Sequence, residues 1–287
     1  MADGILYLNG AWCGAGEAKI SVMDRGLLFA DAVYEVVRAH KGRTFRVAEH
    51  CARMCNGLRE LEIPAPFSPE EFVEICRGLI KRNAITSGSV YLQVTRGEEP
   101  QRAHRLPEHA RPTMFGFARA VELPSWKSAH PKGVAAITME DFRWHRCNIK
   151  TTMLLPNCLA KQQAIRAGAY EALLVGEDGL LREGSSTSVF AVLDGVLRAH
   201  PATPRVLPSI THSVVLELAR RAAMKVDEKA VTAAEAARAE EMFLASTTLD
   251  VCPLTQLDGR PVGDGRIGPV TKRLIGLFAE FLDAECG

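Results

Sequence analysis

The sequence has no excess of charge of either sign and no long hydrophobic run. Its 35 Lys and Arg are balanced by 34 Asp and Glu, for a formal net charge of +1. No overall field therefore draws the chain to nucleic acid or to an anionic membrane. No apolar run approaches the roughly 20 residues that a transmembrane helix needs. Residues 1–4 lack the basic and apolar regions of a signal peptide. We expect a soluble, cytoplasmic protein with no nucleic-acid or membrane partner.

Several motifs with a definite chemistry are also missing. We expect no GxGxxG dinucleotide motif after a strand. The sequence contains neither a GxxxxGK[ST] phosphate-binding loop nor an HExxH zinc motif, and its 8 cysteines include no CxxC pair. His50, Cys51 and Cys55 could share one face of a helix. Cys51 and Cys55 fit the buried edge of that helix better than a metal site, so we expect ordinary core cysteines and no metal.

The length and composition are those of an ordinary globular protein. A chain of 287 residues holds one large domain or two modest ones, and 47% hydrophobic with 24% charged residues excludes disorder and coiled coil. Short strand-like segments mixed with helices predict an α/β or α+β fold with two lobes. Residues 124–133 are polar and rich in turn-forming residues. We expect them to link a smaller N-terminal α/β domain (1–123) to a larger C-terminal domain (134–287).

Local signals place many of the elements. Asn9-Gly10 favours a hairpin turn, because both residues tolerate positive φ. Ser68-Pro69 followed by Glu70-Glu71 is typical of a helix start. Gly168 suits a helix end. We expect strands at 90–95, 114–118, 134–139, 172–175 and 189–192, and helices from 47, from 69, over 157–167, near 211 and from 270.

Three clusters of polar residues stand out as candidate chemistry. Residues 143–150 carry four basic side chains in eight positions, which repel one another unless an anion lies nearby. A lysine among cations is a candidate amine nucleophile, but a solvated basic loop gives the same pattern. Residues 183–188, EGSSTS, form either a polar loop that orients a ligand or a loop of turn-formers. Serine and threonine at 209–211 and 246–248 either bind phosphate or cap a helix.

A fourth segment carries an arginine beside a histidine. Arg102-Ala103-His104 follows the expected strand at 90–95. This pair could bind a carboxylate through charge-assisted hydrogen bonds, or it could be an ordinary solvated loop.

Taken together, the motifs resemble the fold-type IV aminotransferases that use pyridoxal 5′-phosphate (PLP), and within that class the D-amino acid (D-alanine) aminotransferases. The resemblance runs in order through nearly the whole chain. The matching segments are Asp24-Arg25-Gly26, residues 29–37 (FADAVYEVV), Glu49-His50 with Arg53, residues 93–97 (QVTRG), Arg102-Ala103-His104, residues 143–150, Glu183-Gly184-Ser185-Ser186 and Ser246-Thr247-Thr248.

The resemblance implies a role for each matching residue. Lys150 is the Schiff-base lysine and Glu183 the partner of the pyridine nitrogen of PLP. The other residues expected to contact PLP are Arg53, Ser186, Leu207, Ile210, Thr211 and Thr247. Tyr34, Arg102 and His104 match the trap for the substrate α-carboxylate. The resemblance also implies a two-domain fold with PLP at the domain interface, and a homodimer in which the trap arginine and histidine come from the partner subunit.

The implied activity is a D-amino acid transaminase. It would move the amino group of a D-amino acid, such as D-alanine, to a 2-oxo acid, such as 2-oxoglutarate, giving D-glutamate by a ping-pong aldimine and ketimine mechanism. Ala30, Ala32, Asn148 and Ser188 depart from the usual pattern, which bears on side-chain specificity but leaves Lys150 and Glu183 in place. The alternatives within the class are a branched-chain L-aminotransferase, an (R)-amine transaminase and an aminodeoxychorismate lyase. A non-catalytic PLP-fold binding protein is a further alternative.

Overall fold

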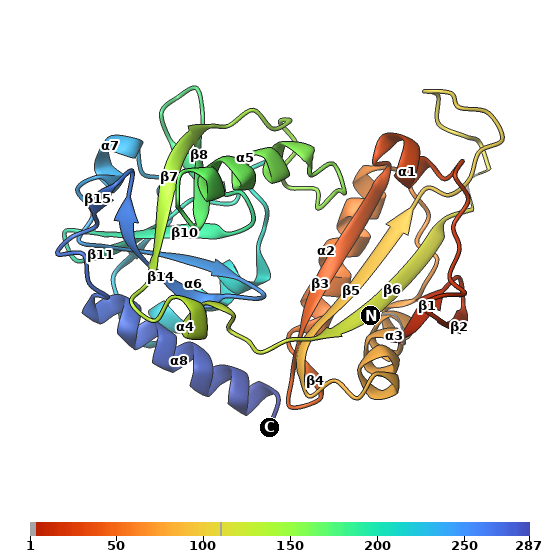
Figure 1. The fold of residues 1–287 in the computed structure, drawn as a ribbon, viewed down its shortest axis with the longest axis horizontal. Helices are drawn as coiled ribbons and strands as arrows, with labels where there is room; N and C mark the ends of the chain where they lie inside the picture. The colour runs from red at the N-terminus through yellow and green to blue at the C-terminus, as the bar shows by residue number, and fades with distance from the viewer. Residues whose placement is uncertain (1–3, 110) are drawn as a thin grey trace. The chain divides into compact units, whose positions relative to one another are not determined.

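The computed structural model describes residues 4–109 and 111–287, and the chain divides into two compact units (Figure 1). Unit 1 holds the described residues up to Glu122 together with Ile149–Met153 and Glu285–Gly287, and unit 2 holds Leu123–Asn148 and Leu154–Ala284. The expected mixture of helices and strands is confirmed. Among the described residues, no helix is both long and apolar enough to cross a bilayer.

The two units are not continuous in sequence. The short segment Ile149–Met153, which carries Lys150, belongs to unit 1 although its neighbours on both sides belong to unit 2. Residues 124–133, expected as a linker, lie within unit 2 and contain the helix α4 (Trp126–Ala129). Trp126 anchors α4, because its buried indole N–H donates a hydrogen bond to the Leu249 carbonyl at 3.0 Å.

Unit 1 is built on an antiparallel sheet. Its described strands number six, in the order β2-β1-β6-β5-β3-β4. Their bounds are β1 Ile5–Leu8, β2 Ala11–Gly14, β3 Ala32–His40, β4 Arg43–Thr44, β5 Ser87–Thr95 and β6 Thr113–Ala120. The β1–β2 hairpin turns at Asn9-Gly10, both with positive φ, as predicted.

Two long helices pack with this sheet, and a short one lies before β3. The three are α1 (Arg25–Phe29), α2 (Val47–Glu60) and α3 (Pro69–Arg82). The predicted start of α3 is confirmed: the Ser68 side chain accepts the Glu71 amide and Glu71 accepts the Ser68 amide, which forms a capping box. Figure 1 shows α2 alongside β3. Their contact is close because Gly57 has no side chain, and a Cβ there would lie 3.1 Å from Val33.

Unit 2 contains a mixed sheet. Its described strands number nine, in the order β12-β11-β10-β13-β14-β7-β8-β9, with β15 paired to β14. The strands are β7 Val134–Glu140, β8 Glu171–Val175, β9 Leu181–Gly184, β10 Ser188–Leu193, β11 Val196–Ala199, β12 Val226–Asp227, β13 Glu241–Ser246, β14 Asp250–Leu257 and β15 Arg260–Pro261. The pairs β14–β7, β7–β8 and β11–β12 are parallel, and the other pairs are antiparallel.

The helices of unit 2 follow the sequence signals closely. Besides α4, they are α5 (Leu155–Arg166), α6 (Ile210–Arg221), the short α7 (Ala233–Ala236), which was not expected, and α8 (Pro269–Glu285). Gly168, with φ of +73°, follows the end of α5 as expected. Ala160 and Ala164 let α5 pack closely on β7 and β8, since small side chains leave little distance between helix and sheet. The α6 helix is capped by Ser209, whose hydroxyl accepts the His212 amide.

Candidate active site

Lys150 is held against the edge of β3. The Tyr34 amide donates to the Lys150 carbonyl at 3.0 Å, and Val33 and Thr151 form an antiparallel bridge. Ile149 and Thr151, on either side of the lysine, are both buried. Lys150 Nζ lies 4.3 Å from the centroid of the Tyr34 ring. Two residues predicted from the sequence, the Schiff-base lysine and the trap tyrosine, are thus in direct contact within unit 1.

A buried carboxylate on the same strand holds Arg53. Glu35 is fully buried, and its two oxygens accept from Arg53 Nε at 2.6 Å and Arg53 Nη2 at 2.8 Å. His50, one turn before Arg53 on α2, lies with Nδ1 2.7 Å from Glu35. Burial alone would raise the pKa of Glu35, but Arg53 and His50 together lower it to about 2. Burial lowers the pKa of His50 and outweighs the effect of Glu35.

Sequence reasoning found Arg53 but missed Glu35 as the residue that orients it. The signal was present, because Glu35 is an acidic residue inside the apolar strand sequence AVYEVV. A buried charge of this kind requires a partner. His50, considered above with Cys51 and Cys55, uses its Nδ1 for this carboxylate.

Arg102 and His104 both contact the side chain of Phe29. The Arg102 guanidinium is 4.8 Å from the centroid of the Phe29 ring, and the His104 ring meets Phe29 edge-on at 5.7 Å. Tyr34 stacks on Tyr91 at 5.5 Å in addition to its contact with Lys150. The structure therefore places the three predicted trap residues of one chain in two groups, Tyr34 with the lysine and the other two on Phe29.

Glu183, at the end of β9 in unit 2, is fixed by a cation and an amide. Arg143 Nη1 donates to Glu183 at 2.6 Å, and the Leu207 amide donates to both of its oxygens at 3.3 and 3.2 Å. Arg143 is itself held by Asp141 through Nε and Nη2, each at 2.9 Å. Burial alone would lower the pKa of Arg143, but Asp141 and Glu183 raise it.

The contacts of Arg143 show which anions compensate the first basic side chain of the segment 143–150. Its first arginine is not solvated, because the anions that compensate it are Asp141 and Glu183. The lysine at its other end belongs to unit 1. Arg143 therefore serves the Glu183 carboxylate within unit 2.

The hydroxyl-rich loop after Glu183 is organised by a second buried carboxylate. Glu171, on β8, is fully buried and accepts hydrogen bonds from the hydroxyls of Ser185, Ser186 and Thr187. The Asn157 side chain adds a hydrogen bond to the Ser185 carbonyl at 2.8 Å. Sequence reasoning selected Ser186 but missed Glu171, which lies 14 to 16 residues from its partners.

The remaining predicted residues lie around the start of α6 and the end of β13. Ile210 and Thr211 are the first two residues of α6, and Thr211 is buried. Ser209 accepts the His212 amide and so caps the helix, which is one of the two roles considered for this segment. Amides in the first turn have no acceptor within the helix, so those of Ile210 and Thr211 suit an anion. Thr247 follows β13 directly.

A second helix start in unit 2 is already occupied by a carboxylate of the chain itself. Gly263, Gly265 and Gly268 have the spacing GxGxxG between β15 and α8, so the expectation that no such spacing follows a strand is wrong. Glu241 accepts the amides of Val270 and Thr271 at the first turn of α8. A Cβ at Gly268 would lie 2.1 Å from Glu241, so this glycine makes room for the carboxylate. The segment is a packing feature and not a nucleotide site.

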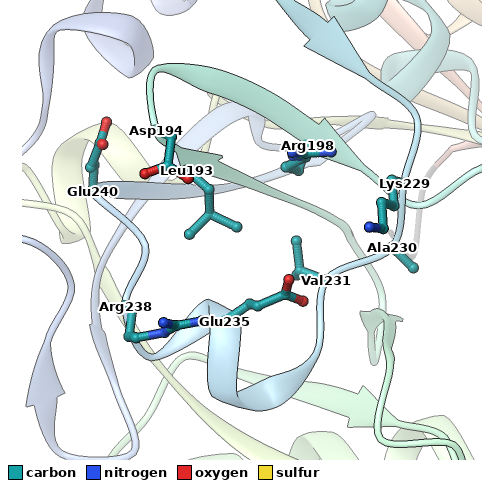
Figure 2. Close-up of a pocket in the computed structure, with 9 residues that line it drawn as sticks. All are labelled: Leu193, Asp194, Arg198, Lys229, Ala230, Val231, Glu235, Arg238 and Glu240. Atoms are coloured by element: carbon teal, nitrogen blue, oxygen red, sulfur yellow. The ribbon is translucent and has the colours of Figure 1, made fainter.

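Figure 2 shows a pocket of about 170 Å³ elsewhere in unit 2. It is lined by Leu193, Asp194, Arg198, Lys229, Ala230, Val231, Glu235, Arg238 and Glu240. Three basic and three acidic side chains line it. One of these carboxylates, Glu235, accepts hydrogen bonds from the amide and the hydroxyl of Thr232. The residues predicted for the active site are not among those that line it.

The residues present fit the groups of PLP. Glu183 offers a buried acceptor of the kind that a protonated pyridine nitrogen requires, with Arg143 and the Leu207 amide stabilising its negative charge. In unit 2 the α6 start has amides of a kind suited to a phosphate. In unit 1 Arg53 is a donor of a kind suited to the same group. Lys150 supplies the amine.

Comparison with known proteins agrees with this chemistry. Residues 32–257 match the model of the family described as amino-transferase class IV. The D-alanine aminotransferase of Staphylococcus haemolyticus is 35% identical over 282 residues, 98% of each chain. That of Bacillus licheniformis is 38% identical over 269 residues, 94% of each chain.

Solved structures with the same fold carry a different name. The branched-chain amino acid aminotransferase of Escherichia coli matches with a TM-score of 0.91 and 26% identity, over 99% of this chain and 96% of that one. The T.th. branched-chain amino acid aminotransferase, complexed with N-(5′-phosphopyridoxyl)-L-glutamate, matches with a TM-score of 0.89 and 30% identity, over 99% and 95%. The chain belongs to the class IV aminotransferases, which have the fold-type IV architecture and use PLP.

Proposed function

We propose that this aminotransferase takes the amino group of a D-amino acid, D-alanine in the first place, and transfers it to a 2-oxo acid, with 2-oxoglutarate as the acceptor. The observation that carries the proposal is the pair Arg102 and His104. They lie in one loop and both contact the ring of Phe29. A guanidinium beside an imidazole provides several donors for one carboxylate. Similarity to two D-alanine aminotransferases at 35% and 38% identity supports the same substrate class.

Each unit contributes its own residues to the reaction. When bound, PLP supplies the electron sink that stabilises negative charge at the substrate Cα. In unit 1, Lys150 holds the cofactor and its Nζ then carries the proton from the substrate Cα, a role that needs a neutral amine. Arg53, oriented by Glu35, binds the phosphate. Tyr34, in contact with Lys150 Nζ, positions that amine and belongs to the carboxylate trap.

In unit 2, Glu183 accepts the hydrogen bond of the pyridine nitrogen, with its charge stabilised by Arg143. Leu207 and Ser186 would lie beside the ring, and Ile210, Thr211 and Thr247 would bind the phosphate. The hydrogen bond that the Leu207 amide donates to Glu183 supports this role for Leu207. The position of Ser186 follows from Glu171, which accepts its hydroxyl at 3.1 Å.

The proposal is tested by the visible absorption spectrum of the purified holoenzyme, recorded before and after D-alanine, L-alanine or L-leucine is added. Loss of the yellow lysine–cofactor band with D-alanine alone is the expected result. Loss with L-leucine would instead assign the chain to the branched-chain L-aminotransferases, the name carried by the solved structures above. Lys150→Ala should abolish turnover while the fold survives, and normal turnover in that variant would contradict the assignment of Lys150.

Oligomeric state is part of the proposal. We propose a homodimer in which Arg102 and His104 of one subunit complete the trap of the other. Within one chain Tyr34 contacts Lys150, while Arg102 and His104 contact Phe29, and this division supports the arrangement. Sedimentation velocity should give a dimer, and an active monomer would contradict the proposal.

A further inference from the structure

Phe29 contacts Arg102 and His104, the two recognition side chains of the proposed trap loop, and it also contacts Arg25. The guanidinium carbons of Arg25 and Arg102 each lie 4.8 Å from the centroid of its ring. The His104 ring meets it at 5.7 Å with the two planes at 75°. Cations over an aromatic ring are attracted by its quadrupole, and an edge-on ring is a favoured aromatic geometry. One half-buried phenyl ring thus contacts Arg102 and His104 at the same time.

The backbone of the loop is held by the same short helix. Arg25 Nη1 donates to the carbonyl of Ala103 at 2.7 Å and to that of Arg105 at 3.3 Å. These two carbonyls alternate with the two recognition residues along the chain. Arg25 is buried, so the hydrogen bonds are protected from competing water. Both the loop backbone and its side chains are therefore fixed by α1.

The rest of unit 1 holds α1 in place. Asp31 accepts Arg25 Nε at 2.9 Å and Arg96 Nε at 2.7 Å, and it joins α1 to the residue after β5. Arg96 also donates to the Leu61 carbonyl. Next to Arg25 in α1, a Cβ on Gly26 would lie 2.4 Å from Thr95 Cγ2, so only glycine allows the helix to pack this closely on β5.

We propose that Phe29, supported by Arg25, is a positioning and specificity-determining residue: it orders Arg102 and His104 for the substrate α-carboxylate. This inference rests on the proposed function. Arg102 and His104 are exposed in the single chain, and a long exposed side chain that must be ordered on binding weakens affinity. A ring that contacts both residues before the substrate arrives removes part of that cost. Phe29 acts through the two residues and does not touch the substrate.

The experiment compares steady-state kinetics of the holoenzyme with D-alanine at saturating 2-oxoglutarate. Phe29→Leu keeps an apolar side chain but loses the aromatic ring. Because exposed cation–π contacts are modest and 1.4 kcal/mol corresponds to tenfold, we expect its KM for D-alanine to rise about three- to tenfold while kcat changes less. Phe29→Tyr, which keeps an aromatic ring, should have the same KM for D-alanine as the wild type. The melting temperature and the visible cofactor band should not change.

Two further variants separate this inference from the proposed function. Phe67→Leu is the matched control, because it removes a half-buried ring of unit 1 that packs on Phe72 and not on the loop. Arg102→Ala is the reference for the trap. In an Arg102→Ala background, Phe29→Leu should raise KM by a smaller factor than it does in the wild type. If Arg102→Ala raises KM but Phe29→Leu behaves like Phe67→Leu, the positioning role is wrong and the trap stands. If Arg102→Ala leaves KM unchanged, the trap is wrong and the positioning role falls with it.

Discussion

The Glu35 carboxylate binds the Arg53 guanidinium through two hydrogen bonds, at 2.6 and 2.8 Å, with Glu35 wholly buried and 9% of the Arg53 side chain exposed. Two parallel bonds fix the plane of the guanidinium as well as its position. Arg53 thus reaches its proposed phosphate partner already oriented. The structural element responsible is the pairing of one strand residue with one helix residue, since β3 supplies the carboxylate and α2 the guanidinium.

Glu35→Gln should destabilise the protein strongly. The change removes the carboxylate that pairs with the buried Arg53 cation, and breaking a buried pair typically costs about 3–5 kcal/mol. Urea unfolding of the apoenzyme at pH 7.5 measures the loss, because a bound phosphate would itself offset the charge of Arg53. Titration of the apoenzyme with PLP should also show weaker binding, because Arg53 is no longer oriented.

Glu74→Gln is the matched control. Glu74 also accepts from an arginine, Arg77, at 2.8 Å, but both side chains are about two-thirds exposed. Exposed pairs of this kind contribute up to about 1 kcal/mol. Equal stability of the two variants would mean that the Glu35–Arg53 pair does not hold unit 1 together.

The helices and strands could be predicted from the sequence because their signals are local. The capping box at Ser68 and Glu71 spans four residues, and Gly168 directly follows the helix that it terminates. Lys150 and Glu183 could be selected as candidates from the sequence, since the motifs that carry them are contiguous, and their roles stay predictions. Each of these features depends on residues that are neighbours along the chain.

The partners that orient those residues were not found, because they come from distant parts of the chain. Glu171 and Ser185 are 14 residues apart, and Arg25 and Ala103 are 78 apart. Which of them meet is decided by strand register and helix packing, and not by local spacing. The placement of Lys150 in unit 1 is of the same kind, because it follows from the pairing of Thr151 with Val33. The available signal was an acidic residue among apolar ones, within β3 at Glu35 and at the first position of β8 at Glu171.

Glu171→Leu should destabilise the hydroxyl-rich loop and weaken cofactor retention. The substitution removes the acceptor of three hydroxyl groups, at Ser185, Ser186 and Thr187. A buried polar group left without a partner costs about 1–3 kcal/mol, although water entering the loop reduces the sum. Thermal unfolding of the holoenzyme and the rate of PLP loss on dialysis measure the two effects. Glu171→Gln, which keeps one acceptor oxygen, should lie between Glu171→Leu and the wild type.

The exposed Glu177, in the turn after the same strand, provides the control for that experiment. Glu177→Gln removes a carboxylate without removing a buried acceptor, so its melting temperature and PLP loss should match the wild type. Should Glu171→Leu retain PLP as firmly as Glu177→Gln, the carboxylate would have no part in ordering the loop.

His212 should make the protein less stable in mild acid. Its ring stacks on Phe190 at 4.8 Å, and burial lowers its pKa from 6.5 to about 4. Between these two pH values the unfolded chain takes up a proton at His212 and the folded chain does not. The stabilising contribution is therefore complete above pH 6.5 and is lost as the pH falls toward 4.

The size of this effect can be measured against His212→Phe. At pH 5.0 the linkage amounts to about 2 kcal/mol, since each pKa unit corresponds to about 1.4 kcal/mol. His212→Phe, which extends the stack of Phe190 on Phe243, should lose less stability than the wild type between pH 7.5 and 5.0. Urea unfolding at the two pH values checks this, with the exposed His109→Asn as a control that keeps the wild-type pH dependence. Parallel pH profiles for wild type and His212→Phe would show that His212 does not carry the effect.

Mixed dimers test whether the trap is shared between subunits. Lys150→Ala and Arg102→Ala homodimers should both be impaired, the first in chemistry and the second in binding D-alanine. In a dimer with one subunit of each kind, the subunit that retains Lys150 receives Arg102 from its partner, so one complete site forms. Co-expressed and tag-purified heterodimers should therefore regain about half of the wild-type activity per dimer, because one of two sites is intact. If Arg102 instead served its own subunit, no complete site would exist in the heterodimer. D-alanine turnover would then not exceed the mean of the two homodimers, which would rule out the shared trap.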